Sequence, residues 1–268
     1  LFHSGTTSWS DSPFGDYANS ADTSIRIAID LSTAIMPMLE FWHRYSLQEN
    51  ADYGYVEASI DKGVTWTRLY FVTGGSAEWL KERIDLAGYA GQANVMLRFR
   101  LITDASTTAD GWYIDDVSIK ETPTTTLAYP FSDNMDGATT DNWLSSSWEL
   151  ATGSGHSLPN TWSDSPRGNY VLDAWSELVL ANVIDLSTAK KPQLTFWHKY
   201  NLYDFQGYES GIGYVNEHDF GRVYVSNYFG KSGTYQQVAQ YTGVQGEWIQ
   251  VQIDLSNYAG LNSVRINF

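Results

Sequence analysis

Two adjacent carboxylates offer the most specific chemistry in this sequence. Asp115 and Asp116 lie in the segment Gly111–Val117, whose aromatic and β-branched residues predict a β-strand. Because neighbouring side chains of a strand point to opposite faces, we expect one carboxylate to face inward or toward an edge. Burying it unpaired is costly, and a Ca²⁺ ion, which prefers several oxygen ligands, would offset that cost. The alternative is that such acids cap turns and accept backbone N–H bonds.

Catalytic motifs are missing from the sequence. It contains no His-Glu-x-x-His motif for zinc, no Gly-x-Ser-x-Gly elbow and no phosphate-binding glycine loop with lysine. Without cysteine it has neither a thiolate nucleophile nor disulfides. Four of the five histidines occupy equivalent positions of an internal repeat, which favours hydrogen-bonded structural roles: His3 with His156, and His43 with His198. We therefore expect no enzymatic activity from these 268 residues.

A segment rich in tyrosine and glycine, from 203 to about 218, is a candidate ligand-binding loop. Exposed aromatic rings on a loop could stack on sugar rings or dock onto a neighbouring protein. The candidate rings are Tyr203, Phe205, Tyr208 and Tyr214. The alternative is a long hairpin whose aromatic side chains cover one end of the domain.

The segment Ser59–Trp66 reads Ser-Ile-Asp-Lys-Gly-Val-Thr-Trp and is similar to the Asp-box hairpin of sialidase propellers. Mechanically, such a hairpin is a turn in which the aspartate, here Asp61, braces backbone N–H groups while the tryptophan anchors the turn. A single box does not make a propeller, so the pattern predicts a stabilised turn rather than a glycosidase.

The composition limits both the fold and the partners. Aromatic residues make up 15% of the chain and charged residues only 18%, which favours a β-rich fold. The net charge of −15 argues against nucleic acid, because phosphate binding needs basic patches. No apolar run has the length of a membrane-spanning segment, so we expect no membrane insertion.

An internal repeat decides the expected architecture. The motif Trp-Ser-Asp-Ser-Pro occurs at Trp9 and again at Trp162, and Phe-Trp-His occurs at Phe41 and again at Phe196. The offset is 153 residues for the first motif, 155 for the second and 169 for a later Ile-Asp-Leu motif. The growing offset places the insertion in the second copy within the segment of about 203–218.

The strand signals of both copies predict β-sandwiches. Ser24–Ile29, Val95–Leu101 and Trp248–Ile253 alternate polar and apolar residues, and glycine-rich turns separate such segments. We therefore predict a first repeat over 1–121, a linker over 122–128 and a second repeat over 129–268. Aligning the copies leaves the first without its opening strand and the second without its closing strand.

Taken in order, the motifs carry a family resemblance. They are Trp-Ser-Asp-Ser-Pro, Ile-Asp-Leu-Ser-Thr-Ala, Phe-Trp-His-x-Tyr, Gly-Val-Thr-Trp and Asp-Gly-Trp-Tyr-Ile-Asp-Asp-Val. This order resembles the non-catalytic jelly-roll domains attached to immune inhibitor A type secreted bacterial metallopeptidases, and more distantly MAM domains and cleaved-adhesin domains. The resemblance implies an all-β fold of two tandem jelly rolls, each incomplete at one terminus, and an extracellular or cell-surface location.

The same resemblance implies a cation site. In such jelly rolls the first and last strands lie together, and an acid from each helps to hold a cation. Asp136 stands where the first-strand acid usually is, and Asp11 and Asp164 occupy the other matching positions. With Asp115 and Asp116 these residues make up the expected Ca²⁺ ligands, although neither copy contains a complete set.

Three functions follow from these observations. The first is an extracellular structural or adhesive repeat, stabilised by Ca²⁺, whose open sheet edges pair with other copies or neighbouring repeats into a fibre. The second is a carbohydrate-binding module for a polysaccharide. The third is an accessory domain of a secreted peptidase.

Overall fold

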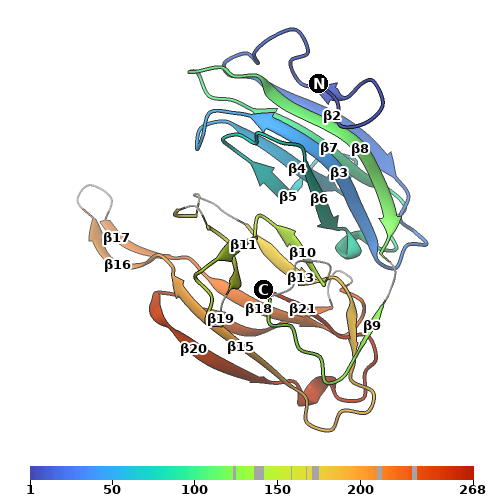
Figure 1. Cartoon of the computed structure of the whole chain (residues 1–268), viewed down its shortest axis with the longest axis vertical. Helices are drawn as coiled ribbons and strands as arrows, with labels where there is room; N and C mark the ends of the chain where they lie inside the picture. Colours follow the sequence, from blue (N-terminus) through green and yellow to red (C-terminus); the bar gives the residue numbers. More distant parts are fainter. Residues whose placement is uncertain are drawn as a thin grey trace. The chain divides into compact units, whose positions relative to one another are not determined.

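The computed structural model of the chain describes residues 1–122, 125–135, 142–157, 159–166, 168–170, 175–209, 213–230 and 234–268 (Figure 1). Its regular elements are β-strands apart from two 3₁₀ turns, η1 (Ala87–Tyr89) and η2 (Ser256–Tyr258). This confirms the predicted all-β class. The chain divides into two compact units. Unit 1 consists of 1–123, 144–149 and 164–177, and unit 2 of 124–143, 150–163 and 178–268.

Unit 1 is a sandwich of two four-stranded antiparallel sheets, drawn from blue to green in Figure 1. One sheet has the order β1-β8-β3-β6, with bounds Trp9–Ser10, Gly111–Glu121, Pro37–Ser46 and Leu80–Asp85. The other has the order β2-β7-β4-β5, with bounds Asp22–Ile29, Val95–Ile102, Tyr53–Ser59 and Thr67–Val72. These interleaved orders are those of an eight-stranded jelly roll.

Aromatic rings from both sheets fill the core of unit 1. Phe41 of β3 meets Phe99 of β7 edge to face, with centroids 5.0 Å apart, and Phe99 meets Trp112 of β8 at 5.8 Å. His43 is fully buried among them, and its Nδ1 accepts a hydrogen bond from the indole Nε1–H of Trp112 at 3.2 Å. A buried imidazole with such a donor fits the structural role expected for this histidine.

Most residues of the remaining strands belong to unit 2, and these strands form a five-stranded sheet and several two-stranded ones. The large sheet has the order β10-β13-β21-β18-β19, with bounds Trp143–Ser146, Glu177–Leu180, Arg265–Asn267, Gly221–Ser226 and Tyr235–Tyr241. The pairs are β11 (Glu149–Thr152) with β12 (Asn160–Ser163), β9 (Thr126–Ala128) with β14 (Val183–Asp185), β15 (Gln193–Asn201) with β20 (Val244–Asp254), and β16 (Asp204–Glu209) with β17 (Gly213–His218).

The repeat seen in the sequence recurs in strand pairing. The β3–β6 register runs from Met38 opposite Asp85 to His43 opposite Leu80. The β15–β20 register runs likewise from Gln193 opposite Asp254 to His198 opposite Ile249. The order β13-β21-β18-β19 also parallels β2-β7-β4-β5. Because the described strands of unit 2 do not form two four-stranded sheets, a second jelly roll stays a prediction.

The predicted linker and the predicted insertion both contain β-strands. Part of the predicted linker, Thr126–Ala128, forms β9 and pairs in parallel with β14. The predicted insertion forms an antiparallel hairpin in which Asp204 of β16 lies opposite His218 of β17 (Figure 1). The backbone of the insertion therefore forms a hairpin, while the covering of one domain end by its aromatic side chains stays a prediction.

The repeated Ile-Asp-Leu motifs end strands by a common mechanism. Asp30 Oδ1 accepts the backbone N–H of Ser32 at 2.9 Å, and Asp185 Oδ1 accepts that of Ser187 at 2.8 Å. Hydrogen bonds from the serine side chain and then from its backbone N–H stabilise the ionised carboxylates and lower the pKa of both aspartates. The aspartate in each motif therefore turns the chain out of its sheet.

Removing the Trp112 ring should destabilise unit 1 strongly. The residue is 3% exposed, so Trp112→Ala leaves a cavity and takes away the donor to His43. We expect the free energy of unfolding to fall by about 3–5 kcal/mol, measured by urea denaturation. Trp9→Ala is the matched control, because Trp9 is 65% exposed. Equal losses for the two variants would contradict this account of the core.

Candidate functional site

The outer face of the sheet β2-β7-β4-β5 gathers arginine and aromatic side chains from all four strands. Residues directly opposite each other on antiparallel strands share a face. One row across the sheet is Ser24, Arg100, Tyr55 and Phe71, and the next row is Arg26, Arg98, Glu57 and Arg68. Asp22, Ile102 and Tyr53 form the row beyond. We call this surface of unit 1 the arginine face.

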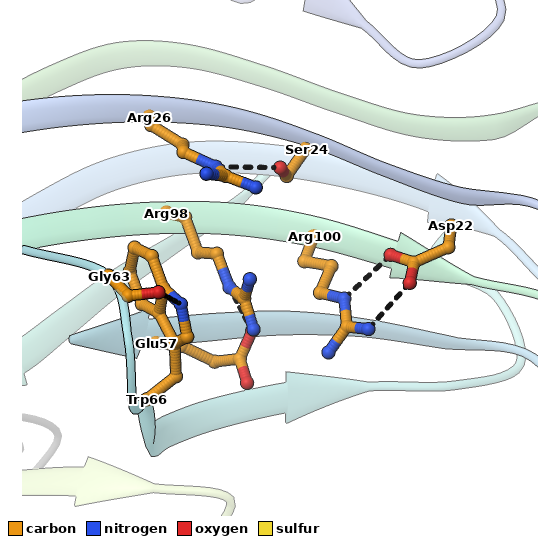
Figure 2. A network of polar contacts seen from close by, with 8 residues as sticks. All are labelled: Asp22, Ser24, Arg26, Glu57, Gly63, Trp66, Arg98 and Arg100. Carbon is orange, nitrogen blue, oxygen red and sulfur yellow. Dashed lines mark hydrogen bonds and ion pairs between the residues drawn. The ribbon is translucent and has the colours of Figure 1, made fainter. Parts of the chain in front are cut away.

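A buried ion pair fixes the middle of the arginine face. Arg98 Nε donates to Glu57 Oε2 at 2.6 Å, and both side chains are about nine-tenths buried. The Arg98 guanidinium also lies 4.0 Å from the ring centre of Trp66, in cation–π geometry (Figure 2). Ion pair and ring together hold this guanidinium in one orientation.

Two further arginines flank that pair. Arg100 makes a bidentate pair with Asp22, at 2.7 Å through Nε and 2.6 Å through Nη2 (Figure 2). Hydrogen bonding and charge lower the pKa of Asp22. Arg26 Nε donates to Ser24 Oγ at 3.2 Å, and among the described residues Arg26 has no carboxylate within ion-pair distance. Arg26 is exposed, and its guanidinium lies 5.7 Å from the centre of the Trp66 ring.

Aromatic rings complete the arginine face. The rings of Tyr53 and Tyr55 stack at 5.7 Å with an interplanar angle of 8°, and the Arg68 guanidinium lies 4.3 Å from the Tyr55 centroid. Burial raises the pKa of Tyr55, which keeps its hydroxyl protonated. Flat rings beside guanidinium donors can hold a planar or sugar-like group that carries negative charge.

The Asp-box turn positions Trp66 over this face. Asp61 accepts the backbone N–H groups of Val64 at 3.0 Å and Thr65 at 2.9 Å, together with the Thr65 hydroxyl at 2.6 Å. The indole Nε1–H of Trp66 donates to the carbonyl of Gly63 at 3.0 Å (Figure 2). The turn thus has the bracing aspartate and anchoring tryptophan that the sequence predicted.

The structure places the predicted metal ligands Asp115 and Asp116 differently from the expectation. Between the pairs Trp42–Asp115 and Glu40–Ser118, β8 has one residue more than β3, and Asp116 has a φ of 49°. This bulge breaks the alternation of side chains, so the two carboxylates do not point to opposite faces.

Both carboxylates instead bind the same segment, His3–Ser4. Asp115 Oδ2 accepts the backbone N–H of His3 at 2.8 Å, and Asp116 Oδ2 lies 2.7 Å from His3 Nδ1. The Ser4 hydroxyl donates to Asp116 Oδ1 at 2.6 Å. These bonds lower the pKa of Asp116. The carboxylates therefore fasten the N-terminal segment to β8.

The remaining predicted ligands are dispersed. Asp11 Oδ1 accepts the backbone N–H of Trp112 at 2.6 Å, and desolvation by burial raises its pKa. Asp164 Oδ1 accepts the hydroxyl of Ser165 at 3.1 Å. Asp136 lies outside the described residues. Within the described part of the chain, no group of three or more His, Asp or Glu is placed to hold a metal ion.

The predicted ligand-binding aromatics lie in or beside the β16–β17 hairpin. Tyr203 and Phe205 stack at 6.3 Å, and Tyr203 and Tyr214 are 45% and 65% exposed. Tyr208 lies opposite Tyr214 in the backbone register. The exposed rings of Tyr203 and Tyr214 thus form a second surface, besides the arginine face, that is accessible to a ligand.

An apolar pocket of about 240 Å³ lies beside β1 and β2 in unit 1. Its apolar lining includes Phe99, Leu101, Trp112 and Ile114, and Trp9 stands at its side. The polar residues Ser10, Asp11, Thr23 and Ser24 complete the lining, and the apolar ones belong to the core of unit 1.

Sequence reasoning missed the arginine face. The signals were the spacing-by-two pairs Ser24 with Arg26, Arg98 with Arg100, and Tyr53 with Tyr55. Such pairs place two polar side chains on one face of a strand. Only the register between strands brings the three pairs together.

Fold and site together define a β-sandwich protein with an exposed surface suited to binding. No family model matches the chain. It is 34% identical over 110 residues to Bacillopeptidase F of Bacillus subtilis (strain 168), a match that covers 40% of this chain and 8% of that protein. The chain thus matches only a small fraction of that relative.

Two solved structures show weaker likeness. A carbohydrate-binding module in complex with β-1,4-galactotriose has a TM-score of 0.28 at 17% identity, over 40% of this chain and 68% of that one. The glycoside hydrolase domain of Endo-D from Streptococcus pneumoniae R6 has a TM-score of 0.27 at 13% identity, over 92% and 33%. Such scores carry no functional argument. Among the described residues, no helix is long and apolar enough to cross a bilayer.

The Asp61 turn should stabilise unit 1 in a pH-dependent way. Hydrogen bonds lower the Asp61 pKa from 3.8 to about 2, so its contribution is present above pH 3.8 and is lost as the pH falls through about 2. Asp61→Asn should lower the melting temperature at pH 5, with a smaller difference from the wild type at pH 2. Val64→Ala, in the same turn and 81% exposed, is the control and should leave both temperatures unchanged.

Proposed function

We propose that this chain is a non-catalytic β-sandwich accessory module of a larger extracellular protein, and that its arginine face binds an acidic polysaccharide. The main support for this proposal is the arginine face, where guanidinium groups from three strands lie beside stacked tyrosine rings. The function rests on binding because no catalytic motif accompanies that surface in the sequence.

The partial match to a peptidase supports an accessory role. A stretch of 110 residues related at 34% identity makes up 8% of Bacillopeptidase F, as one module of a long protein would. A module that holds its parent protein near a polymer raises the local concentration of whatever the parent acts on. The structural or adhesive role, with pairing between copies, stays a prediction.

Charge favours an acidic ligand on the arginine face. The chain as a whole carries a net charge of −15, whereas this face has four arginines against the two carboxylates Asp22 and Glu57. Guanidinium groups bind carboxylate and sulfate in bidentate geometry, and tyrosine rings stack on sugar rings. A polymer of acidic sugars supplies both kinds of group.

Replacing two arginines should abolish much of this binding. Arg26→Ala combined with Arg100→Ala should weaken retention by polygalacturonate in affinity electrophoresis at least about tenfold, because two positive charges are removed and the Asp22 carboxylate loses its partner. Arg44→Ala, on β3 of the other sheet, is the matched control. Retention should also decline with salt. Two results would contradict the proposal. One is equal retention of the double variant and the control, and the other is binding to neutral galactan as strong as that to polygalacturonate.

Bound Ca²⁺ is a further proposal, carried over from the family resemblance. The described carboxylates Asp11, Asp115 and Asp116 are engaged in hydrogen bonds, so the proposal depends on Asp136, which lies outside the described residues. A ligand bound only by the folded state raises the melting temperature. We therefore expect EGTA to lower it and added Ca²⁺ to restore it, measured by calorimetry. An unchanged melting temperature would exclude the ion.

A further inference from the structure

Three side chains of the arginine face form a cluster of hydrogen-bond donors on β2 and β7. Ser24 lies directly opposite Arg100 in the strand register, and Arg26 lies directly opposite Arg98. Side chains offset by two positions across a strand pair are still within reach of each other when they are long. Arg26 is therefore a diagonal neighbour of Arg100, and Ser24 adjoins both. We call Ser24, Arg26 and Arg100 the donor cluster.

Positive charge at the donor cluster is incompletely compensated. Arg98 is paired with Glu57, and its guanidinium is nearly buried. Arg26 faces Arg98 directly, yet within the described ranges of the chain it has no carboxylate at ion-pair distance. Like charges directly opposite each other on a strand pair are destabilising. An anion bound at Arg26 would relieve that repulsion.

Each member of the donor cluster retains donor groups that its described neighbours do not use. Arg26 Nε donates to Ser24 Oγ at 3.2 Å, so the hydroxyl hydrogen of Ser24 is left to donate elsewhere (Figure 2). Arg100 uses Nε and Nη2 for the Asp22 carboxylate, which leaves its Nη1 group (Figure 2). The terminal nitrogens of Arg26 also lack an acceptor among the residues that the structure describes. One hydroxyl and two guanidinium groups therefore remain as donors.

This set of donors favours an anion with three free oxygens over a carboxylate. A planar carboxylate matches one guanidinium in bidentate geometry, and Asp22 already binds Arg100 in that way. A carboxylate offers only two oxygens, whereas a sulfate ester offers three in a tetrahedral arrangement. Three donor groups on two neighbouring strands therefore suit the sulfate ester better.

The charge of the site favours a sulfate ester over a phosphate ester. Arg26 and Arg100 carry two positive charges against the single negative charge of Asp22, so one positive charge is left. A sulfate ester carries one negative charge, whereas a phosphate monoester carries about −1.5 to −2 at pH 7. The sulfate ester thus neutralises the site, and the phosphate ester would add negative charge beside Asp22.

We propose that the donor cluster binds the sulfate ester of a sulfated polysaccharide. The two guanidinium groups and the Ser24 hydroxyl together donate to its three free oxygens. The sugar ring packs on Tyr55, which lies directly opposite Arg100 on β4 and stacks with Tyr53. Ser24 distinguishes sulfate from carboxylate, because arginine pairs with either anion. The inference rests on the proposed function, since it names the acidic group that the arginine face binds.

Dextrans that differ only in their substituent test this inference on the whole chain. The probes are dextran sulfate, carboxymethyl-dextran and dextran phosphate at matched charge per sugar, together with unmodified dextran. Affinities are measured by calorimetry at one ionic strength, because salt screens all charged contacts. We expect dextran sulfate to bind at least about tenfold more tightly than carboxymethyl-dextran, because one further hydrogen bond to a charged group forms.

Variants of Ser24 show whether its hydroxyl provides the preference. Ser24→Ala should weaken binding of dextran sulfate at least about tenfold and change binding of carboxymethyl-dextran by less than about twofold. Ser24→Thr keeps a hydroxyl and should retain the preference for sulfate. Thr23→Ala is the matched control, because neighbouring side chains of β2 point to opposite faces.

The outcomes separate this inference from the proposed function. Equal affinity for the sulfated and carboxymethylated dextrans, or equal losses for both in Ser24→Ala, would overturn the inference and leave an acidic polysaccharide as the ligand. Tighter binding of dextran phosphate than of dextran sulfate would assign the donor cluster to phosphate esters and overturn the inference too. Binding to none of the charged dextrans, or equally strong binding to unmodified dextran, would contradict the proposed function as well.

Discussion

The pairing of β3 with a strand on each of its edges is the interaction on which unit 1 depends. β6 and β8 flank β3, and this places Trp112 and Ile114 beside the aromatic core. With both edges paired, the polar backbone of β3 is satisfied and its apolar side chains leave water together. His43 can then be buried completely, because the same strand that covers it also supplies its hydrogen-bond donor. Strand β8 therefore supplies both the apolar cover of His43 and its hydrogen-bond donor.

The surface of unit 1 is tied to that strand as well. Asp11 accepts the N–H of Trp112 where β8 begins, and the bulge at Asp116 fastens His3 to the same strand further along. These carboxylates accept hydrogen bonds from neighbouring chain segments. Their charges are therefore compensated although they lie beside the sheet. Acidic residues in this chain thus act as connectors between segments far apart in the sequence.

Several features could be predicted from the sequence because they are local or repeated. Strand alternation, the Asp61 turn and the equivalence of His43 with His198 all depend on spacing along the chain. The bulge at Asp116 could not be predicted, since it depends on register against β3. The arginine face was missed for a similar reason: Arg98 meets Glu57 only across a strand pair, and nothing in either segment alone indicates it. Likewise β9 lies in a stretch whose threonines suggested a linker, and a parallel partner decides its structure.

Comparison of the two units shows which parts of the repeat are free to change. Glu57 opposite Arg98 in unit 1 corresponds by register to Tyr224 opposite Asn267 in unit 2, so the buried ion pair is replaced by uncharged side chains. The inward-facing partners change little, because Val56 and Val223 are both buried under the sheet. Core positions are held by packing density. On the other face of unit 2, Asn267 is 6% exposed and Arg265 is 0% exposed, so packing limits these positions as well. A charged pair buried on an outer face is therefore weak support for stability, since well-packed neutral residues can take its place.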